Sequence, residues 1–172
     1  MNHLPAGVPD RLLHFLYEHN VEFEFVAPGV PMPTVLAAAA ALGVSTDLIL
    51  KTLLFVGDDG YVVAIANGTH RIDRSRLADA VGMRKPRPAK PDDVIAVTGY
   101  PAGGVAPLGL PPSVPVIVDA GTAALTFAYG GGGQEHLLLR VNVSDVIRCN
   151  NALVADITEG PKHTGQSHLR AT

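Results

Sequence analysis

The stretch "DLILKTLLFVGDDGYVVAIANG", residues 47–68, is almost wholly apolar on both sides of a Gly-Asp-Asp-Gly turn. Asp-Gly favours the left-handed backbone of a tight turn, and the Tyr, Val and Ile content favours strands over the competing helix. Residues 51–66 are therefore predicted to form a β-hairpin. Lys51 stands at the start of its first strand, although lysine is among the residues least often buried without a partner.

Helices and strands are predicted on both sides of this hairpin from capping residues, apolar periodicity and Gly/Pro breaks. The predicted helices begin at the capping residues Asp10, Thr34 and Asp73, with shorter ones at 92–97 and 144–151. The predicted strands are 21–26, 116–120, 125–130, 136–143 and 152–157. Because this order is not a strict βαβ alternation, the sequence predicts one domain of mixed α/β or α+β class. A polar tail, 158–172, is expected to be disordered.

The composition is that of an ordinary globular protein. The 172 residues can form one sizeable core, and the net charge of −3 argues against attraction of nucleic acid over the whole surface. A single cysteine, Cys149, excludes an intrachain disulfide and fits a reducing cytoplasm. No apolar run approaches the ~20 residues that span a bilayer, and the N-terminus does not resemble a signal peptide. A cytoplasmic location without membrane contact is expected.

The sequence lacks the motifs of several common kinds of active site. It has no GxxxxGK[ST] phosphate loop, so the glycines of 129–134 are interpreted as a hairpin turn. The seven histidines show no metal-binding spacing, there is no GxSxG elbow, and Cys149 is interpreted as a small buried apolar residue. Neither a metal site nor a serine or cysteine nucleophile is expected.

Three features leave both a structural and a functional interpretation open. Lys51 either packs its stem while its ammonium group reaches solvent, or holds that group in a pocket to bind phosphate, polarise a carbonyl or form a Schiff base. The loop 98–109, "TGYPAGGVAPLG", is either a plain surface loop or a stiffened platform of backbone N–H donors. Seven of the 13 Lys and Arg residues lie between 71 and 90, as a solvated face or as a footprint for RNA.

Four segments in this order resemble the YbaK / prolyl-tRNA-synthetase-associated domain family. They are "LGVSTDLILKTLLF", "VVAIANGTHRIDRSRLADAVG", "TGYPAGGVAPLGLPPSVPVIVDA" and "SDVIRCNNALVADI". The Lys-Thr-Leu stretch and the TGY…GGVxPLG loop are the most specific of them. The resemblance covers roughly residues 10 to 157, so residues 1–157 are expected to be the YbaK-like domain.

The resemblance implies an enzyme of translation that hydrolyses the ester between a wrong amino acid and its tRNA. At this length the chain is similar to the free-standing, trans-editing members, which points to tRNA(Pro) as the tRNA. The implied fold is a mixed, partly closed β-sheet flanked by helices, with the terminal adenosine of the tRNA in a cleft. The family uses no metal and no organic cofactor. The implied partners are the acceptor end of aminoacylated tRNA and, in some members, an aminoacyl-tRNA synthetase.

The family pattern, taken residue by residue, gives a set of candidate site residues. The family's lysine matches Lys51, and its GxxxP loop matches Gly103 through Pro107. The expected catalytic residues are Lys51 and Gly103, the expected substrate-binding residues are Thr98, Gly99, Gly104, Pro107, Asn67 and Asp119, and the expected RNA-binding residues are Arg84, Lys85 and Arg87.

The residue types fit this chemistry and leave two points open. A fixed cation and loop N–H groups can hold phosphate and polarise an ester carbonyl without a protein nucleophile, so Lys51 is expected to act electrostatically rather than as a general base. The loop 26–33 matches no subgroup of the family, which leaves cysteine, alanine and serine as candidate amino acids. The alternative functions are a non-catalytic module that binds tRNA or a nucleotide and, less well supported, a lysine Schiff-base enzyme.

Overall fold

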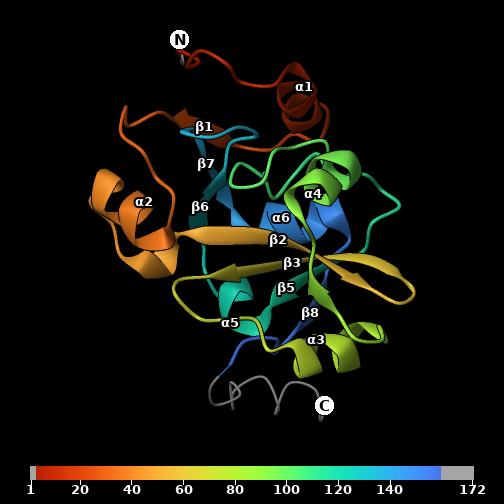
Figure 1. Ribbon diagram of the computed structural model, residues 1–172. Helices are drawn as coiled ribbons and strands as arrows, with labels where there is room; N and C mark the ends of the chain where they lie inside the picture. Colours follow the sequence, from red (N-terminus) through yellow and green to blue (C-terminus); the bar gives the residue numbers. More distant parts are fainter. Residues whose placement is uncertain (1–2, 160–172) are drawn as a thin grey trace.

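The computed structural model describes residues 3–159 as a mixed α/β domain with two β-sheets (Figure 1). The predicted hairpin forms its centre, with β2 at Leu50–Gly57 and β3 at Gly60–Asn67. The two strands pair antiparallel from Leu50↔Asn67 to Gly57↔Gly60, so the turn is the two aspartates between the glycines. The prediction of a hairpin with a tight turn at this place is confirmed, but neither aspartate has a positive φ, and the positive φ of the turn lies at Gly60.

The larger sheet has five strands in the order β4-β2-β3-β5-β8. Its other members are β4 (Arg87–Pro88), β5 (Val116–Asp119) and β8 (Leu153–Ala155). β2 is antiparallel to β3 and β4, whereas β3, β5 and β8 run parallel. β4 pairs with only two residues of β2, Phe55 and Val56. Between the start of β2, which lies next to β6, and Phe55, the strand is therefore paired with β3 alone.

The smaller sheet has three antiparallel strands in the order β1-β7-β6. They are β1 (Phe23–Val26), β6 (Phe127–Gly131) and β7 (Leu138–Asn142). An isolated parallel bridge, Ile49↔Tyr129, links this sheet to the start of β2. The predicted mixed, partly closed architecture is thus built from two sheets that meet at the beginning of the hairpin.

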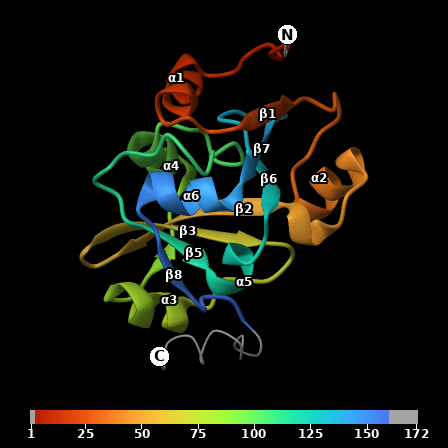
Figure 2. The ribbon, with the colours of Figure 1, turned by 180° about the vertical axis from the view of Figure 1, so that it is seen from behind.

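Helices cover both faces of the larger sheet. Seen from behind, α6 (Val143–Asn150) lies across β2 and β3 (Figure 2), and its Val143 and Val146 share the main core with Val63 and Ile65. On the opposite face, Leu77 of α3 (Arg74–Val81) packs with the alternate residues of β2 and β3. The hairpin strands are therefore covered by apolar residues on both faces, which explains the continuous apolar run.

The remaining helices are α1 (Asp10–Glu18), α2 (Val35–Leu42), α4 (Pro91–Thr98), the short α5 (Ala120–Ala123) and the 3₁₀ turn η1 (Thr46–Leu48). Thr34 caps α2 by accepting from the N–H of Ala37, and Asp73 caps α3. Both helices end at a glycine with φ near +68°. These boundaries are as predicted because each depends on local chemistry.

Some details differ from the prediction. The N-cap of α1 is Pro9, and Asp10 is the first residue of the helix, where its charge favours the helix N-terminus. The backbone of Thr158 and Glu159 is tied to the segment 71–72, so the described fold runs past residue 157. The rest of the predicted tail, 160–172, lies outside the described residues. No helix within residues 3–159 is long and apolar enough to cross a membrane.

Candidate active site

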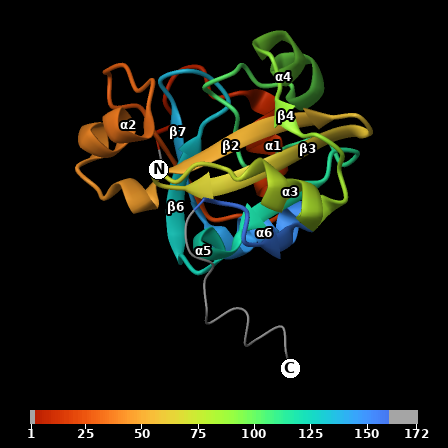
Figure 3. The same cartoon turned by 60° about the horizontal axis from the view of Figure 1, so that its bottom comes forward.

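A small cavity of about 220 Å³ lies where the two sheets meet. Its wall is formed by the segment 32–38 with the start of α2, the first half of β2, the loop at Gly103 and Val105, and single residues of β6 and β7. Figure 3 shows α2 beside the start of β2, with β6 and β7 next to it. The cavity brings together the two predicted catalytic residues, Lys51 and Gly103, which are far apart in the sequence.

The cavity lies at a strand edge rather than on a face of the sheet. The carbonyl of Leu54 accepts from the N–H of Ala89, on the β4 side. Backbone groups of alternate strand residues point the same way, so the N–H and C=O of Thr52 also point away from β3, at a place that β4 does not reach. Lys51 and Thr52 have side chains on opposite faces, and both line the cavity because it opens at the edge between those faces.

Lys51 lines the cavity, and the residue as a whole is intermediate in exposure. Its Nζ donates to the backbone carbonyl of His70, in the segment that follows β3. Burial lowers the pKa of Lys51 from the ordinary value of 10.5, and the nearby positive charge of Arg71 lowers it further. Lys51 therefore lines the cavity while its ammonium group is held by the His70 carbonyl.

Gly103 and Gly104 are both glycine for different structural reasons. Gly103 has φ +85°, and a Cβ added there would meet no atom within 4 Å, so the left-handed backbone is its only constraint. A Cβ on Gly104 would lie 2.6 Å from the backbone carbonyl carbon of Gln134. Gly103 lines the cavity, whereas Gly104 packs against the turn after β6.

The N–H groups on this side of the cavity are available as donors. Within the part of the chain that the structure describes, the N–H groups of Gly103 and Val105 make no hydrogen bond, while the N–H of Gly104 donates to the Pro101 carbonyl at 3.0 Å. Pro107 packs its ring beside Gly130, and its carbonyl accepts from Asn150 at 2.7 Å. Pro107 therefore anchors the far end of the loop.

Thr98 and Gly99, predicted to bind substrate, lie at the other end of the loop and do not line the cavity. Thr98 is fully buried, and its hydroxyl donates to the Val94 carbonyl at 2.6 Å and accepts from the N–H of Tyr100 at 3.1 Å. Gly99 ends α4 with φ +78°, facing the guanidinium of Arg11. These residues position the loop rather than form the cavity.

Asn67 and Asp119, also predicted to bind substrate, are engaged in structural hydrogen bonds outside the cavity. The amide of Asn67 donates to the Asp47 carbonyl at 2.8 Å and accepts from the Thr122 hydroxyl at 2.6 Å. Asp119 is 3% exposed, and its two carboxylate oxygens accept from the N–H groups of Gly121 and Ile157, each at 3.0 Å. The Asp119 carboxylate caps α5 and fixes the chain after β8.

The predicted RNA-binding residues lie at the opposite end of β2. Arg87 pairs with Val56, and the Arg84 carbonyl accepts from the N–H of Asp58. Val56 lies five residues after Lys51 along the strand, a distance of roughly 17 Å at about 3.3 Å per residue. Arg84, Lys85 and Arg87 are exposed. Arg71 is the member of the basic cluster whose charge acts on Lys51, so the cluster is divided between the cavity and the hairpin turn.

The residues that the sequence did not predict form much of the wall. Met32, Val35, Ala38 and Leu138 line the cavity together with Thr52. Thr52 stands next to Lys51, but strand alternation places it on the opposite face, and only the open edge of β2 brings both to one site. The described lining includes no Asp or Glu, and within residues 3–159 no group of three or more His, Cys, Asp or Glu side chains could hold a metal ion.

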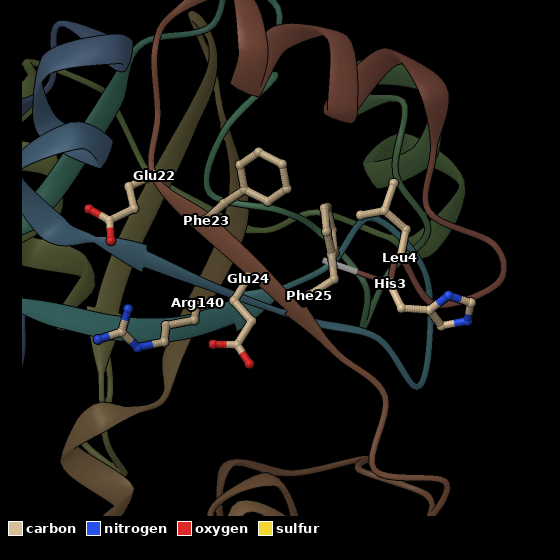
Figure 4. Close-up of a pocket in the computed structure, with 7 residues that line it drawn as sticks. All are labelled: His3, Leu4, Glu22, Phe23, Glu24, Phe25 and Arg140. Atoms are coloured by element: carbon tan, nitrogen blue, oxygen red, sulfur yellow. The ribbon is translucent and has the colours of Figure 1, made fainter. Parts of the chain in front are cut away.

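Larger hollows lie elsewhere and contain none of the predicted site residues. One of about 490 Å³ lies at β1, where Glu22, Glu24 and Arg140 lie on one side of the strand and Phe23 and Phe25 on the other (Figure 4). A groove of about 660 Å³ runs between α1, the segment 109–116 and the end of α6. We take the smaller cavity as the candidate site because, among the hollows described, it is the one lined by the predicted lysine and by residues of the predicted loop.

Comparison with known proteins gives consistent matches. The family model described as the aminoacyl-tRNA editing domain matches residues 30–149. A proline–tRNA ligase from Geobacter sp. (strain M21) is 31% identical over 125 residues, 69% of this chain and 22% of that protein. The "Putative Cys-tRNA(Pro)/Cys-tRNA(Cys) deacylase EbsC" of Enterococcus faecalis is 28% identical over 123 residues, 71% of this chain and 75% of that protein. The chain spans about a fifth of the length of the ligases that it matches.

Solved structures match the whole domain. "Crystal structure of hypothetical protein APE2540" has a TM-score of 0.81 and 31% identity, covering 87% of this chain and 100% of that one. A structure described as "a putative trans-editing enzyme for prolyl tRNA synthetase" has a TM-score of 0.80 and 27% identity, covering 92% and 100%. The family model covers the cavity's strand, loop and helix in this chain. The chain belongs to the aminoacyl-tRNA editing domain family.

Proposed function

We propose that the protein is an aminoacyl-tRNA deacylase that hydrolyses the ester of a mischarged small amino acid on tRNA, with tRNA(Pro) as the substrate RNA. The observation that carries the proposal is the joint presence of Lys51 and Gly103 in one cavity of an editing-domain chain. The names of the Enterococcus faecalis relative and of the trans-editing neighbour support the reaction and the tRNA. We also propose residues 1–157 as the editing domain.

The cavity supplies what ester hydrolysis requires of a protein. A water attacks the carbonyl carbon, the carbonyl oxygen takes up negative charge, and the C–O bond to the ribose breaks while the water's proton passes to the leaving ribose oxygen. In this proposal the Lys51 ammonium and the N–H groups of Gly103 and Val105, all from residues that line the cavity, stabilise that negative charge. An aminoacyl ester is already activated, so holding it and one water in place provides much of the remaining rate.

The charge distribution supports a way to hold the RNA. Arg71 lies beside Lys51, so the pair forms a positive site for a phosphate or the developing oxyanion near the terminal adenosine. The exposed residues Arg84, Lys85 and Arg87 lie roughly 17 Å away along β2, where they would contact the backbone of the acceptor stem. Such contacts add affinity without reading sequence.

The alternative function is a module that binds the acceptor end without hydrolysis. To separate the two, tRNA(Pro) is charged in turn with cysteine, alanine, serine and proline, and the release of free amino acid by the protein is measured. The proposal predicts rapid release of one or more of the mischarged amino acids and slow release of proline. Tight binding of every charged tRNA with release at the protein-free rate would support the binding module.

A further inference from the structure

The hydroxyl of Thr52 stands out among the buried polar groups. Thr52 is 9% exposed and lines the cavity, and its Oγ1 is buried and has no hydrogen-bond partner in the described structure. The hydroxyls of the other two buried threonines, Thr98 and Thr122, are both bonded. A buried hydroxyl without a partner destabilises a fold, so one next to a cavity indicates a ligand group that pairs with it.

Apart from Lys51 and the N–H groups of Gly103 and Val105, which the proposed function assigns to the ester carbonyl, the wall offers little that could recognise a polar side chain. Met32, Val35, Ala38, Ile49 and Leu138 are apolar. The Thr34 hydroxyl, which also lines the cavity, already accepts from the N–H of Ala37. A purely apolar pocket accepts an analogue that adds a hydroxyl almost as well as the smaller one, whereas a hydrogen-bonding group in the pocket discriminates strongly between them. Thr52 is therefore the wall residue best placed to distinguish serine from alanine.

The backbone and the side chain of Thr52 can bind different groups of the substrate. The backbone C=O of Thr52 points away from β3 into the unpaired stretch of the edge, where it can accept from the α-amino group that every aminoacyl ester carries. That leaves the side-chain hydroxyl, which both donates and accepts, for the side chain of the substrate. In the proposed complex, the Thr52 side chain turns about its Cα–Cβ bond so that the hydroxyl, buried in the described structure, reaches the cavity. A thiol is a much weaker partner, so a cysteinyl ester gains less.

We propose that Thr52 is a specificity-determining residue whose hydroxyl bonds the side-chain hydroxyl of a seryl ester, so that the site prefers seryl- over alanyl-tRNA. This inference rests on the proposed function, since it concerns the substrate of the same cavity. The hydroxyl of a seryl ester can pair with the Thr52 hydroxyl, whereas the apolar side chain of an alanyl ester leaves it unpaired.

The test compares Thr52→Val, which keeps the shape, with Thr52→Ser, which keeps the hydroxyl. The measured quantity is kcat/KM for seryl- and alanyl-tRNA(Pro). Thr52→Val should lower the value for the seryl ester roughly tenfold, the effect of one hydrogen bond, and leave the alanyl ester within about twofold. Thr52→Ser should retain the wild-type preference. An equal loss on both esters, or no loss on either, would overturn the proposal.

Two measurements that need no catalysis separate this inference from the proposed function. Amide-linked seryl and alanyl analogues of the terminal adenosine cannot be hydrolysed as esters, and Thr52→Val should weaken binding of the seryl analogue about tenfold while sparing the alanyl analogue. Thr52→Val should also raise Tm of the empty protein by roughly 2 °C or more, because it removes an unpaired buried hydroxyl. A lowered Tm would show that the hydroxyl has a partner and would contradict the inference even if the protein proved inactive on all esters.

Discussion

The two halves of β2 differ in what borders their outer edge. From Phe55 onward β4 pairs with the strand, and exposed basic side chains flank that short ladder. Between the bridge of Ile49 to β6 and the bond of Leu54 to Ala89, no strand pairs with this edge, and a cavity lies there with Lys51 and Thr52 in its wall. β4 thus covers one end of the outer edge of β2 and leaves the other end open, and the polar groups proposed for catalysis and binding lie at the open end.

The largest loss of activity is expected from a substitution in the loop that faces the open end of β2. Gly103→Val should reduce deacylation to the protein-free rate, because a β-branched residue cannot keep φ +85° and the N–H groups of the loop then leave the cavity. Gly82→Val is the matched control: Gly82 has φ +68°, also has open space around it, and lies at the end of α3. Both variants should lose similar stability in thermal unfolding, and only the first should lose activity. Equal activity losses would point to backbone strain alone.

A smaller loss of activity is expected when Lys51 is replaced by a residue with the same charge and a different shape. Lys51→Arg should lower the deacylation rate constant at least tenfold, because a planar guanidinium cannot take the place of a compact ammonium that donates to the His70 carbonyl. Binding of uncharged tRNA should change little, since the charge remains. A variant with the wild-type rate constant would mean that any positive charge suffices at this position.

The pH dependence of the deacylation rate tests whether Arg71 affects the pKa of Lys51. Burial and Arg71 both lower the pKa of Lys51 from 10.5, so a rate that needs protonated Lys51 should fall as pH rises through a value below 10.5. Arg71→Gln removes one of the two causes and should move this fall to higher pH, toward the ordinary lysine value. The measurement is the single-turnover rate constant against pH, after subtraction of hydrolysis without protein. If the rate constant of Arg71→Gln fell at the same pH as that of the wild type, Arg71 would have no effect on the titrating group.

The covered end of β2 should show the smallest effect, and only on binding. Replacing Arg84, Lys85 and Arg87 together by glutamine should weaken binding of uncharged tRNA similarly for different tRNA sequences. The slope of log affinity against log salt should become shallower by roughly 0.7 to 0.9 for each phosphate that the variant no longer neutralises. The rate constant at saturating tRNA should be unchanged, given the roughly 17 Å along the strand to Lys51. Identical titration curves would make this cluster a solvated face.

The sequence predicted those parts of the fold that depend on neighbouring residues. The hairpin was predicted from its Gly-Asp-Asp-Gly turn. Helices α2 and α3 begin and end at the predicted caps because Thr34, Asp73 and two left-handed glycines act locally. The short α5 was missed, since Asp119 looked like the end of a strand, and its carboxylate proves to cap the next turn. Local chemistry fixes boundaries, but it does not say which strand ends up at an edge.

The candidate site was predictable only in part for the same reason. Lys51 stood out as a charge in an apolar run and Gly103 by its loop, and the structure brings the two together. Thr98, Asn67 and Asp119 are polar residues close to the motifs in sequence, yet their side chains bond to other parts of the fold. Thr52 was not predicted because it lines the cavity only where β4 does not pair with β2. Which residues of β2 pair with β4 is a long-range property of the sheet.

The central claim is that the cation at the open edge of β2 promotes ester hydrolysis. It is tested most directly by the single-turnover deacylation rate constant of Lys51→Ala on the best mischarged tRNA, beside Lys85→Ala at the covered end. The account predicts a loss of about a hundredfold or more for Lys51→Ala, comparable to removing one strong electrostatic stabiliser, with Tm almost unchanged and Lys85→Ala close to wild type. A folded Lys51→Ala protein that hydrolyses the ester at the wild-type rate would contradict it.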